Sequence, residues 1–167
     1  GGHCIPKDPV YLSWRAKMDG LDVGFIDHAV QINNRMPQYI VDRVADLLNE
    51  KEKPLHGSQL LLLGVSYKHD VADIRESPAL TILDILKQKQ ALITYHDPYV
   101  PFLAYNGQTL KSQHLDSRLL SDQDCVIITT DHSCVDYQFV VEHSPLILDT
   151  RNATRSLQRC YPHVHTL

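Results

Sequence analysis

The 167-residue sequence lacks several features that mark large classes of protein. No apolar run approaches the roughly 20 residues that a helix needs to span a bilayer, and the longest, residues 60–65, is only strand-sized. Positive charge is not in excess, because 16 Lys and Arg stand against 20 Asp and Glu, so a nucleic-acid-binding surface is not expected. With 43% hydrophobic residues, 7 glycines and 9 prolines, the chain is predicted to be a soluble globular protein, neither collagen-like nor disordered.

Metal-binding motifs are also absent. The four cysteines, Cys4, Cys125, Cys134 and Cys160, form no CxxC pair, and no HExxH segment occurs, so no metal site is predicted. No signal peptide opens the chain, which makes a cytoplasmic location with reduced thiols the default expectation. Cys125 lies in an apolar, strand-like segment and is expected to be buried there.

The first part of the chain is predicted to be helical. Residues 22–49 carry apolar side chains near helical spacing, which predicts one long helix, and Pro37 within it predicts a kink or a break. Such a helix could pack on the following domain or form a subunit interface, and the pattern does not separate the two. A charged segment that ends at Pro54 predicts a boundary between residues 1–53 and residues 54–167.

After this boundary, strand patterns alternate with helix patterns. Ser77 and Pro78 have the residue types of a helix N-cap and a first helical position. Strands that alternate with helices indicate a parallel sheet with right-handed crossovers. The predicted fold class is therefore α/β, with a long central helix followed by a Rossmann-like parallel sheet and flanking helices. Strands are expected over residues 59–66, 91–95, 125–130 and 146–149, and helices over residues 79–86, 116–120 and 137–142.

The segment after the first strand carries charges suited to a phosphate. The GxGxxG fingerprint of a dinucleotide cradle is missing from it. Instead, Lys68 and Arg75 precede the expected helix start at Ser77, and two cations beside the free amides of a helix N-terminus would make a phosphate site. A solvated loop with surface charges is the alternative that the spacing leaves open.

Other segments hold residue types that are used in catalysis. Cys4 lies in a turn with glycine and proline near Lys7, whose charge would favour the thiolate, although most free cysteines are unreactive. Residues 131–133 contain the Asp, His and Ser of a catalytic triad, but consecutive side chains cannot converge on one point, so a turn is predicted. Residues 161–165 are expected to form a tail.

Long motifs in these segments resemble a known family. Residues 1–12 (GGHCIPKDPVYL) and 64–79 (GVSYKHDVADIRESPA) are similar, in sequence, order and separation, to segments of the UDP-glucose/GDP-mannose dehydrogenase family. Residues 95–101 (YHDPYVP) and 148–152 (LDTRN) fit the same family. The resemblance covers nearly the whole chain, from the catalytic cysteine segment to the end of the nucleotide-sugar domain.

The resemblance implies an NAD-dependent oxidation of the C6 alcohol of a nucleotide sugar to a carboxylate in two steps. Cys4 matches the nucleophile, which captures the intermediate aldehyde as a thiohemiacetal; oxidation then gives a thioester, and water releases the acid. This fits the chemistry of a thiol, which adds reversibly to an aldehyde. Asp8 matches the aspartate that positions water or relays protons.

Ligand-contacting residues are implied in the same way. Tyr67 matches an aromatic residue beside the uracil, Lys68 a lysine that contacts the substrate, and Arg151 an arginine that contacts the nucleotide sugar. Arg75 matches an arginine that reaches the phosphates of the NAD cofactor. The expected partners are a UDP-sugar and a second copy of the chain, bound as a homodimer through the helix at residues 22–49. Neither nucleic acid nor a membrane is an expected partner.

Within the family, the HCIP form of the opening segment looks most like the branch that acts on UDP-N-acetylglucosamine or UDP-N-acetylmannosamine. Lys7 is shared with the UDP-glucose branch, and His69 replaces a common lysine. The N-terminal NAD-binding domain of the family is not in this sequence, so the chain is predicted to be the C-terminal part of a longer protein and to be inactive alone. A UDP-sugar-binding or dimerisation module without catalytic activity is the alternative.

Overall fold

The structure is a computed structural model that describes residues 2, 4–157 and 161–167, so Gly1, His3 and Cys160 lie outside the described residues. The helices are α1 (Asp8–Met18), α2 (Gly24–Asn49), α3 (Pro78–Gln88), α4 (Ser117–Ser121) and α5 (Tyr137–His143). The strands are β1 (Gln59–Leu63), β2 (Leu92–His96), β3 (Phe102–Tyr105), β4 (Gln108–Lys111), β5 (Cys125–Ile128), β6 (Ile147–Asp149) and β7 (Val164–Thr166).

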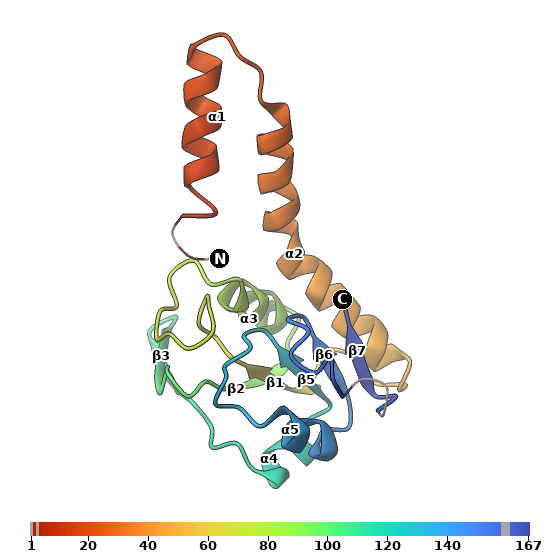
Figure 1. Ribbon diagram of the computed structural model, residues 1–167. Coiled ribbons are helices and arrows are strands. Elements are labelled where there is room, and N and C mark those ends of the chain that lie inside the picture. The colour runs from red at the N-terminus through yellow and green to blue at the C-terminus, as the bar shows by residue number, and fades with distance from the viewer. Residues whose placement is uncertain (1, 3, 158–160) are drawn as a thin grey trace.

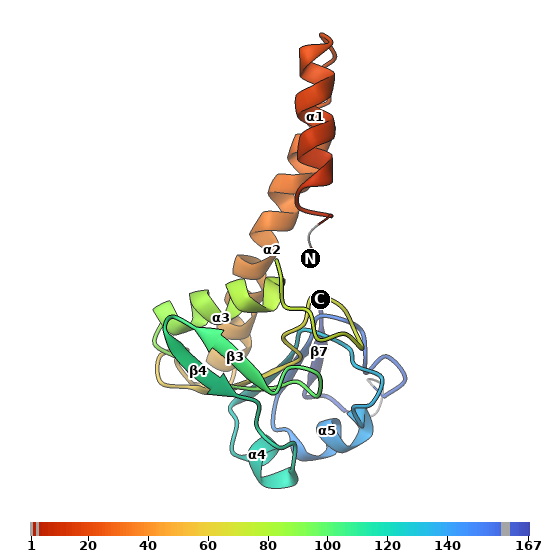
Figure 2. The same cartoon turned by 90° about the vertical axis from the view of Figure 1, so that its left-hand side faces the viewer.

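Helices α1 and α2 form a hairpin that projects from the rest of the molecule (Figures 1 and 2). The second half of α2 lies in the core, where Ile40, Val41, Val44, Leu47 and Leu48 are buried. These positions recur at the spacing of one helix face, as the sequence predicted. Among the described residues, no helix combines the length and the hydrophobicity that crossing a membrane requires.

Helix α2 runs unbroken through Pro37, so a break at this position is ruled out. A proline inside a helix removes one backbone hydrogen bond and crowds the preceding turn, at a cost of about 3 kcal/mol. The buried face that follows Pro37 packs against the sheet and α3, and this burial offsets the loss. Figure 1 shows that the helix axis changes direction between the half beside α1 and the half on the sheet. The helix therefore bends without ending.

Five parallel strands form the central sheet, in the order β2-β1-β5-β6-β7, so the predicted α/β fold is confirmed. From β1 the chain passes through α3 to β2 on one side, whereas the later strands lie on the other side of β1. The order therefore reverses between β1 and β5. In such sheets, ligands bind outside the carboxyl ends of the strands at this switch point. Figure 1 shows β7 running toward the helical hairpin, so these carboxyl ends face the hairpin.

Helices cover both faces of the sheet, which explains its uninterrupted apolar strands. Leu60 and Leu62 of β1 belong to the cluster formed with α2 and α3, whereas Leu61 and Leu63 belong to the cluster formed with α4 and α5. All four are at most 1% exposed, and burying one leucine side chain contributes about 1.5–3 kcal/mol. Cys125 is fully buried in β5, as predicted.

Three local features differ from the sequence prediction. Strand β1 ends at Leu63 rather than at Ser66, because Gly64 turns the backbone with a φ of +88°. Residues 102–111 form the antiparallel hairpin β3–β4, which the alternation of strands and helices did not predict. Val164–Thr166 pairs with β6 as strand β7, so the prediction of a tail is wrong. The expected helices before and after β5, and the one after β1, are all present as α4, α5 and α3.

Candidate functional site

A cavity of about 190 Å³ lies where β1, β5 and β6 end. Its wall includes residues of the loops that follow these strands, namely Ser66, Tyr67, Thr129, Thr150 and Arg151. One face of α2, the first part of α3 and Leu167 complete the wall. The cavity therefore occupies the switch point of the sheet, where a ligand is expected.

The loop after β1 carries Tyr67 and Lys68. The Tyr67 amide donates to the Asp73 carbonyl at 2.9 Å, which closes the loop on itself. Gly2 packs against the Tyr67 ring so closely that a Cβ at Gly2 would lie 2.8 Å from a ring carbon. Lys68 is exposed and does not line the cavity. Of the two predicted substrate residues in this loop, only Tyr67 therefore forms part of the cavity wall.

The turn after β6 holds Arg151 in place. Asp149, buried at the end of β6, accepts hydrogen bonds from the Arg151 amide at 2.9 Å and from the amide and hydroxyl of Thr154 at 2.8 and 2.7 Å. The Arg151 Nε donates to Asp131 Oδ1 at 3.1 Å. Because a guanidinium has five N–H donors, Arg151 keeps donors for a ligand after forming this bond.

Helix α3 begins at the cavity with a hydroxyl for which the described part of the chain provides no hydrogen-bond partner. Ser77 is the N-cap and Pro78 the first helical residue, as predicted, but the Ser77 side chain caps no amide. Ser77 is 4% exposed and lines the cavity, and its hydroxyl makes no hydrogen bond to the described residues. A buried hydroxyl without a partner costs about 1–3 kcal/mol. A ligand oxygen at the helix N-terminus, which favours anions, would remove that cost.

Arg75 lies outside the cavity wall and is engaged by its own neighbour. Its Nε is 3.0 Å from Asp73 Oδ1 and its terminal nitrogen is 2.7 Å from Asp73 Oδ2. The hydrogen bond to Asp73 raises the pKa of Arg75. Of the predicted phosphate site, the helix start at Ser77 thus lines the cavity, whereas Lys68 and Arg75 do not.

The segment that carries Cys4 is joined to the same region. The Cys4 carbonyl accepts hydrogen bonds from the amides of Lys7 at 3.1 Å and Asp8 at 2.8 Å, and these bonds lead the chain into α1. The Lys7 Nζ lies 3.2 Å from a Glu76 carboxylate oxygen, just before α3. Cys4 and Asp8 are both exposed. An ion pair thus links the predicted nucleophile segment to the start of α3.

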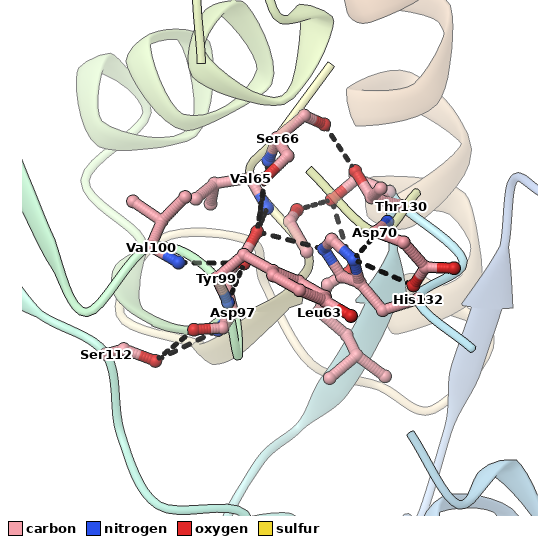
Figure 3. A network of polar contacts seen from close by, with 12 residues as sticks. Leu63, Val65, Ser66, Asp70, Asp97, Tyr99, Val100, Ser112, Thr130 and His132 are labelled. Atoms are coloured by element: carbon pink, nitrogen blue, oxygen red, sulfur yellow. Dashed lines mark hydrogen bonds and ion pairs between the residues drawn. The ribbon is translucent and has the colours of Figure 1, made fainter. Parts of the chain in front are cut away.

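A buried network that the sequence did not predict supports the loops around the cavity (Figure 3). Burial raises the pKa of Asp97, but hydrogen bonds from His132 and from backbone amides outweigh it and hold the pKa well below its ordinary value. The donors come from the loops after β1, β2 and β5, so one carboxylate connects three loops. They are the amides of Val65 (2.7 Å), Ser66 (3.1 Å), Tyr99 (2.9 Å) and Val100 (3.1 Å), the Ser66 hydroxyl (3.0 Å) and His132 Nε2 (3.1 Å).

Two segments of the chain match one protein family. Residues 61–156 match the UDP binding domain of the UDP-glucose/GDP-mannose dehydrogenase family, and residues 1–35 match its central domain. The chain belongs to the UDP-glucose/GDP-mannose dehydrogenase family. The first match contains Tyr67, Ser77 and Arg151, which line the cavity of this dehydrogenase-family chain.

Relatives of known activity and structure are similar over most of the chain. The UDP-glucose 6-dehydrogenase of Rickettsia bellii is 31% identical over 166 residues, which cover 93% of this chain and 37% of that enzyme. The UDP-N-acetyl-D-mannosamine dehydrogenase of Methanococcus maripaludis is 31% identical over 134 residues, 79% of this chain and 28% of that enzyme. The structure of UDP-D-ManNAc dehydrogenase from Pyrococcus horikoshii superimposes with a TM-score of 0.80 at 27% identity, covering 99% of this chain and 38% of that one. The chain therefore spans well under half the length of these relatives.

Proposed function

We propose that this dehydrogenase-family chain binds a UDP-sugar at the cavity between β1, β5 and β6. The observation that carries the proposal is the convergence of Tyr67, Ser77 and Arg151 on one cavity within the matched UDP binding domain. An aromatic ring can stack on a base, and a guanidinium pairs with phosphate oxygens through charge-assisted hydrogen bonds. The Ser77 hydroxyl and the Ala79 amide at the start of α3 can donate to the same anion, and the exposed Lys68 adds a second cation beside this wall.

In a longer protein that contains this chain, Cys4 and Asp8 act on the sugar. A thiolate at Cys4 adds to the carbon of the C6 aldehyde and forms a C–S bond. The thioester that follows oxidation is opened by water, which regenerates the thiol and releases the carboxylate, and Asp8 accepts a proton from that water. This assignment rests on the match of the opening segment to the central domain of the family.

NAD, when bound, supplies the hydride acceptor for both oxidations. The described residues do not form a cradle for it, because the loop between β1 and α3 contains no GxGxxG turn and Arg75 is already paired with Asp73. The acceptor site therefore lies in another part of the longer protein, and Arg75 adds at most a phosphate contact to it.

The substrate class that we propose is a UDP-N-acetylhexosamine, with UDP-N-acetylglucosamine and UDP-N-acetylmannosamine as the candidates. The form of the opening segment supports this choice, and relatives named UDP-N-acetyl-D-mannosamine dehydrogenase agree with it. Relatives named UDP-glucose 6-dehydrogenase keep UDP-glucose as the competing substrate. Activity of the longer protein on the three UDP-sugars decides between them.

Calorimetric titration of the chain with UDP tests the binding proposal. We expect saturable binding that Arg151→Gln weakens at least tenfold, about 1.4 kcal/mol, because the cavity loses its guanidinium. Arg155→Gln is the matched control, since Arg155 is exposed on the same turn and does not line the cavity. Equal affinities of the wild-type chain and Arg151→Gln would contradict the proposal.

The catalytic proposal is tested in the longer protein. Cys4→Ser is expected to abolish formation of the uronic acid while UDP binding stays intact, because the substitution removes only the nucleophile. The chain alone is expected not to reduce NAD⁺ with any UDP-sugar. A longer protein that binds UDP but forms no acid would favour the alternative, a binding module without catalysis.

We also propose that a second copy of the chain covers the α1–α2 hairpin, with residues 1–53 as the dimerisation unit and residues 54–167 as the UDP-sugar domain. Large apolar side chains support this, because Tyr11 is 69%, Trp14 60% and Phe25 85% exposed. Phe25→Glu is expected to convert a dimer to a monomer in light scattering. Phe102→Glu is the control, since Phe102 is 62% exposed on the β3–β4 hairpin of the sheet domain.

A further inference from the structure

His132 is a buried imidazole with a defined hydrogen-bond partner on each ring nitrogen. It is 1% exposed, its Nε2 lies 3.1 Å from Asp97 Oδ2, and its Nδ1 lies 3.0 Å from the Asp70 amide nitrogen (Figure 3). A backbone N–H can only donate, so Nδ1 is the unprotonated acceptor. Nε2 therefore carries the proton and donates it to Asp97, which defines one neutral tautomer.

This imidazole connects the two ends of a short segment, residues 65–70, in the loop that follows β1. At the first end, Val65 and Ser66 donate to the Asp97 oxygen that also accepts from His132. At the other end, Asp70 adopts a φ of +58°, and its amide donates to His132 Nδ1. Its carboxylate accepts from the Ser133 amide at 2.9 Å, which lowers the pKa of Asp70. Residues 67–69 lie between these two anchored ends.

The same residue adjoins the other wall of the cavity. Asp131, which precedes His132 in the chain, accepts the hydrogen bond from Arg151 Nε. The ring of Tyr99 packs on the imidazole with 5.1 Å between ring centroids. His132 thus lies between the loop that carries Tyr67 and the contact that holds Arg151.

We propose that His132 is a positioning residue for the nucleotide site, which as the neutral Nε2–H tautomer holds the loop of Tyr67 and Lys68 against the segment that orients Arg151. A ligand that bridges Tyr67 and Arg151 requires a fixed distance between these two sides of the cavity. The imidazole fixes that distance without touching the ligand. The inference rests on the proposed binding of a UDP-sugar.

Two substitutions at His132 each remove one of its two hydrogen bonds. In His132→Gln the side-chain amide can still donate to Asp97, but the Asp70 amide loses its acceptor. In His132→Asn the shorter side chain can accept from Asp70 but no longer reaches Asp97. Ser58→Ala is the matched control, because the Ser58 hydroxyl is also buried and hydrogen-bonded, at 2.6 Å to Pro54, at the opposite end of β1.

The test compares the dissociation constant for UDP with the melting temperature of each variant. We expect His132→Gln to weaken UDP binding at least tenfold while its melting temperature falls no further than that of Ser58→Ala, which binds UDP like the wild-type chain. A merely structural histidine would lower the UDP affinity and the melting temperature in proportion. UDP affinity within twofold of wild type in both His132 variants would overturn the proposal.

A measurement on the wild-type chain keeps the inference testable if the variants do not fold. Nitrogen-15 spectra are expected to show His132 protonated at Nε2 and unprotonated at Nδ1, and the opposite tautomer would overturn the proposal. If the wild-type chain does not bind UDP at all, the proposed function fails. The positioning role of His132 is then tested by hydrogen exchange at the Asp70 amide. His132→Gln is expected to accelerate this exchange, and an unchanged exchange rate would overturn the positioning role.

Discussion

Replacing Asp97 by Asn tests the idea that one carboxylate, with hydrogen bonds to both of its oxygens, holds the loops after β1, β2 and β5. Oδ2 accepts four hydrogen bonds and Oδ1 accepts two, from the amides of Tyr99 and Val100. An Asn side chain must turn its NH₂ group toward one of these sets of donors. Fewer hydrogen bonds are lost when the NH₂ group faces Tyr99 and Val100, because only the amides of these two residues are then left without an acceptor.

The magnitude follows from those two amides. A buried donor left without a partner costs about 1–3 kcal/mol. The Val100 amide is buried and the Tyr99 amide is partly buried, so Asp97→Asn is expected to lower the free energy of unfolding by about 1–6 kcal/mol. Domains of this kind have unfolding free energies of about 5–15 kcal/mol, so the loss is measurable and does not by itself prevent folding. Urea titration followed by far-ultraviolet circular dichroism measures it, with the slope m checked for constancy.

Asp116→Asn provides the control for this change. Asp116 is the N-cap of α4 and its carboxylate accepts one hydrogen bond, from the Leu119 amide at 2.7 Å. Asn and Asp are nearly equivalent at an N-cap, so the change is expected to stay within about 0.5 kcal/mol. A loss below about 1 kcal/mol in Asp97→Asn would refute the argument, because it lies under the lowest cost of leaving the buried Val100 amide without an acceptor.

The pH dependence of the same comparison has a defined sign. The folded-state pKa of Asp97 is depressed, so its contribution is fully present above the unfolded value of about 3.9 and is lost as pH falls toward the folded value. The difference in stability between the wild-type chain and Asp97→Asn should therefore be constant from pH 5 to 7 and should narrow below about pH 4.

Three further predictions concern separate parts of the fold. Gly64→Ala should lower the melting temperature far more than Gly57→Ala. A Cβ at Gly64 would lie 2.7 Å from the Thr130 carbonyl oxygen, whereas a Cβ at Gly57 would meet nothing within 4 Å. Equal decreases in melting temperature would mean that only the positive φ of the two glycines matters. Ser77→Ala should weaken UDP binding three- to tenfold without loss of stability, since its hydroxyl has no partner among the described residues, and unchanged affinity would remove Ser77 from the site. Burial raises the pKa of Tyr95 to about 12, so Tyr95→Phe should leave the absorbance titration at 295 nm unchanged between pH 9 and 11. Loss of a tyrosine ionisation step in that range would contradict the raised pKa.

Local patterns predicted the elements whose stability is local or comes from simple burial. The apolar run at residues 60–63 predicts a strand covered on both faces, and Ser77-Pro78 predicts the start of α3. The β3–β4 hairpin also has a local signal in the sequence. Asn106 and Gly107 both adopt positive φ, at +46° and +76°, and Asn-Gly is the preferred pair for a two-residue hairpin turn.

Other elements depend on contacts that no local pattern contains. Strand β7 is three residues long and exists through its pairing with β6. The helix continues through Pro37 because the residues after it are buried against distant strands. In each case tertiary packing outweighs a local preference.

The candidate site was predictable in part, and for a similar reason. Tyr67 and Arg151 were identified by resemblance to a family, whereas their convergence on one cavity depends on the strand order. The turn lies at residues 132–135, where the Val135 amide donates to the His132 carbonyl at 3.2 Å, yet His132 also bonds to Asp97 and Asp70, which lie 35 and 62 positions away in the chain. Consecutive residue types cannot reveal such partners.

The two parts of the proposed active site differ in how firmly they are held. Asp97 and Asp149 are each 1% exposed and accept several hydrogen bonds, so they fix the loops around the nucleotide cavity. The Cys4 segment is joined to this region by the Lys7–Glu76 pair, whose side chains are 53% and 47% exposed. Exposed ion pairs contribute only about 0–1 kcal/mol. The loops that Asp97 and Asp149 hold are therefore expected to keep their positions when the cysteine segment is not docked, whereas the Tyr67 ring loses its contact with Gly2.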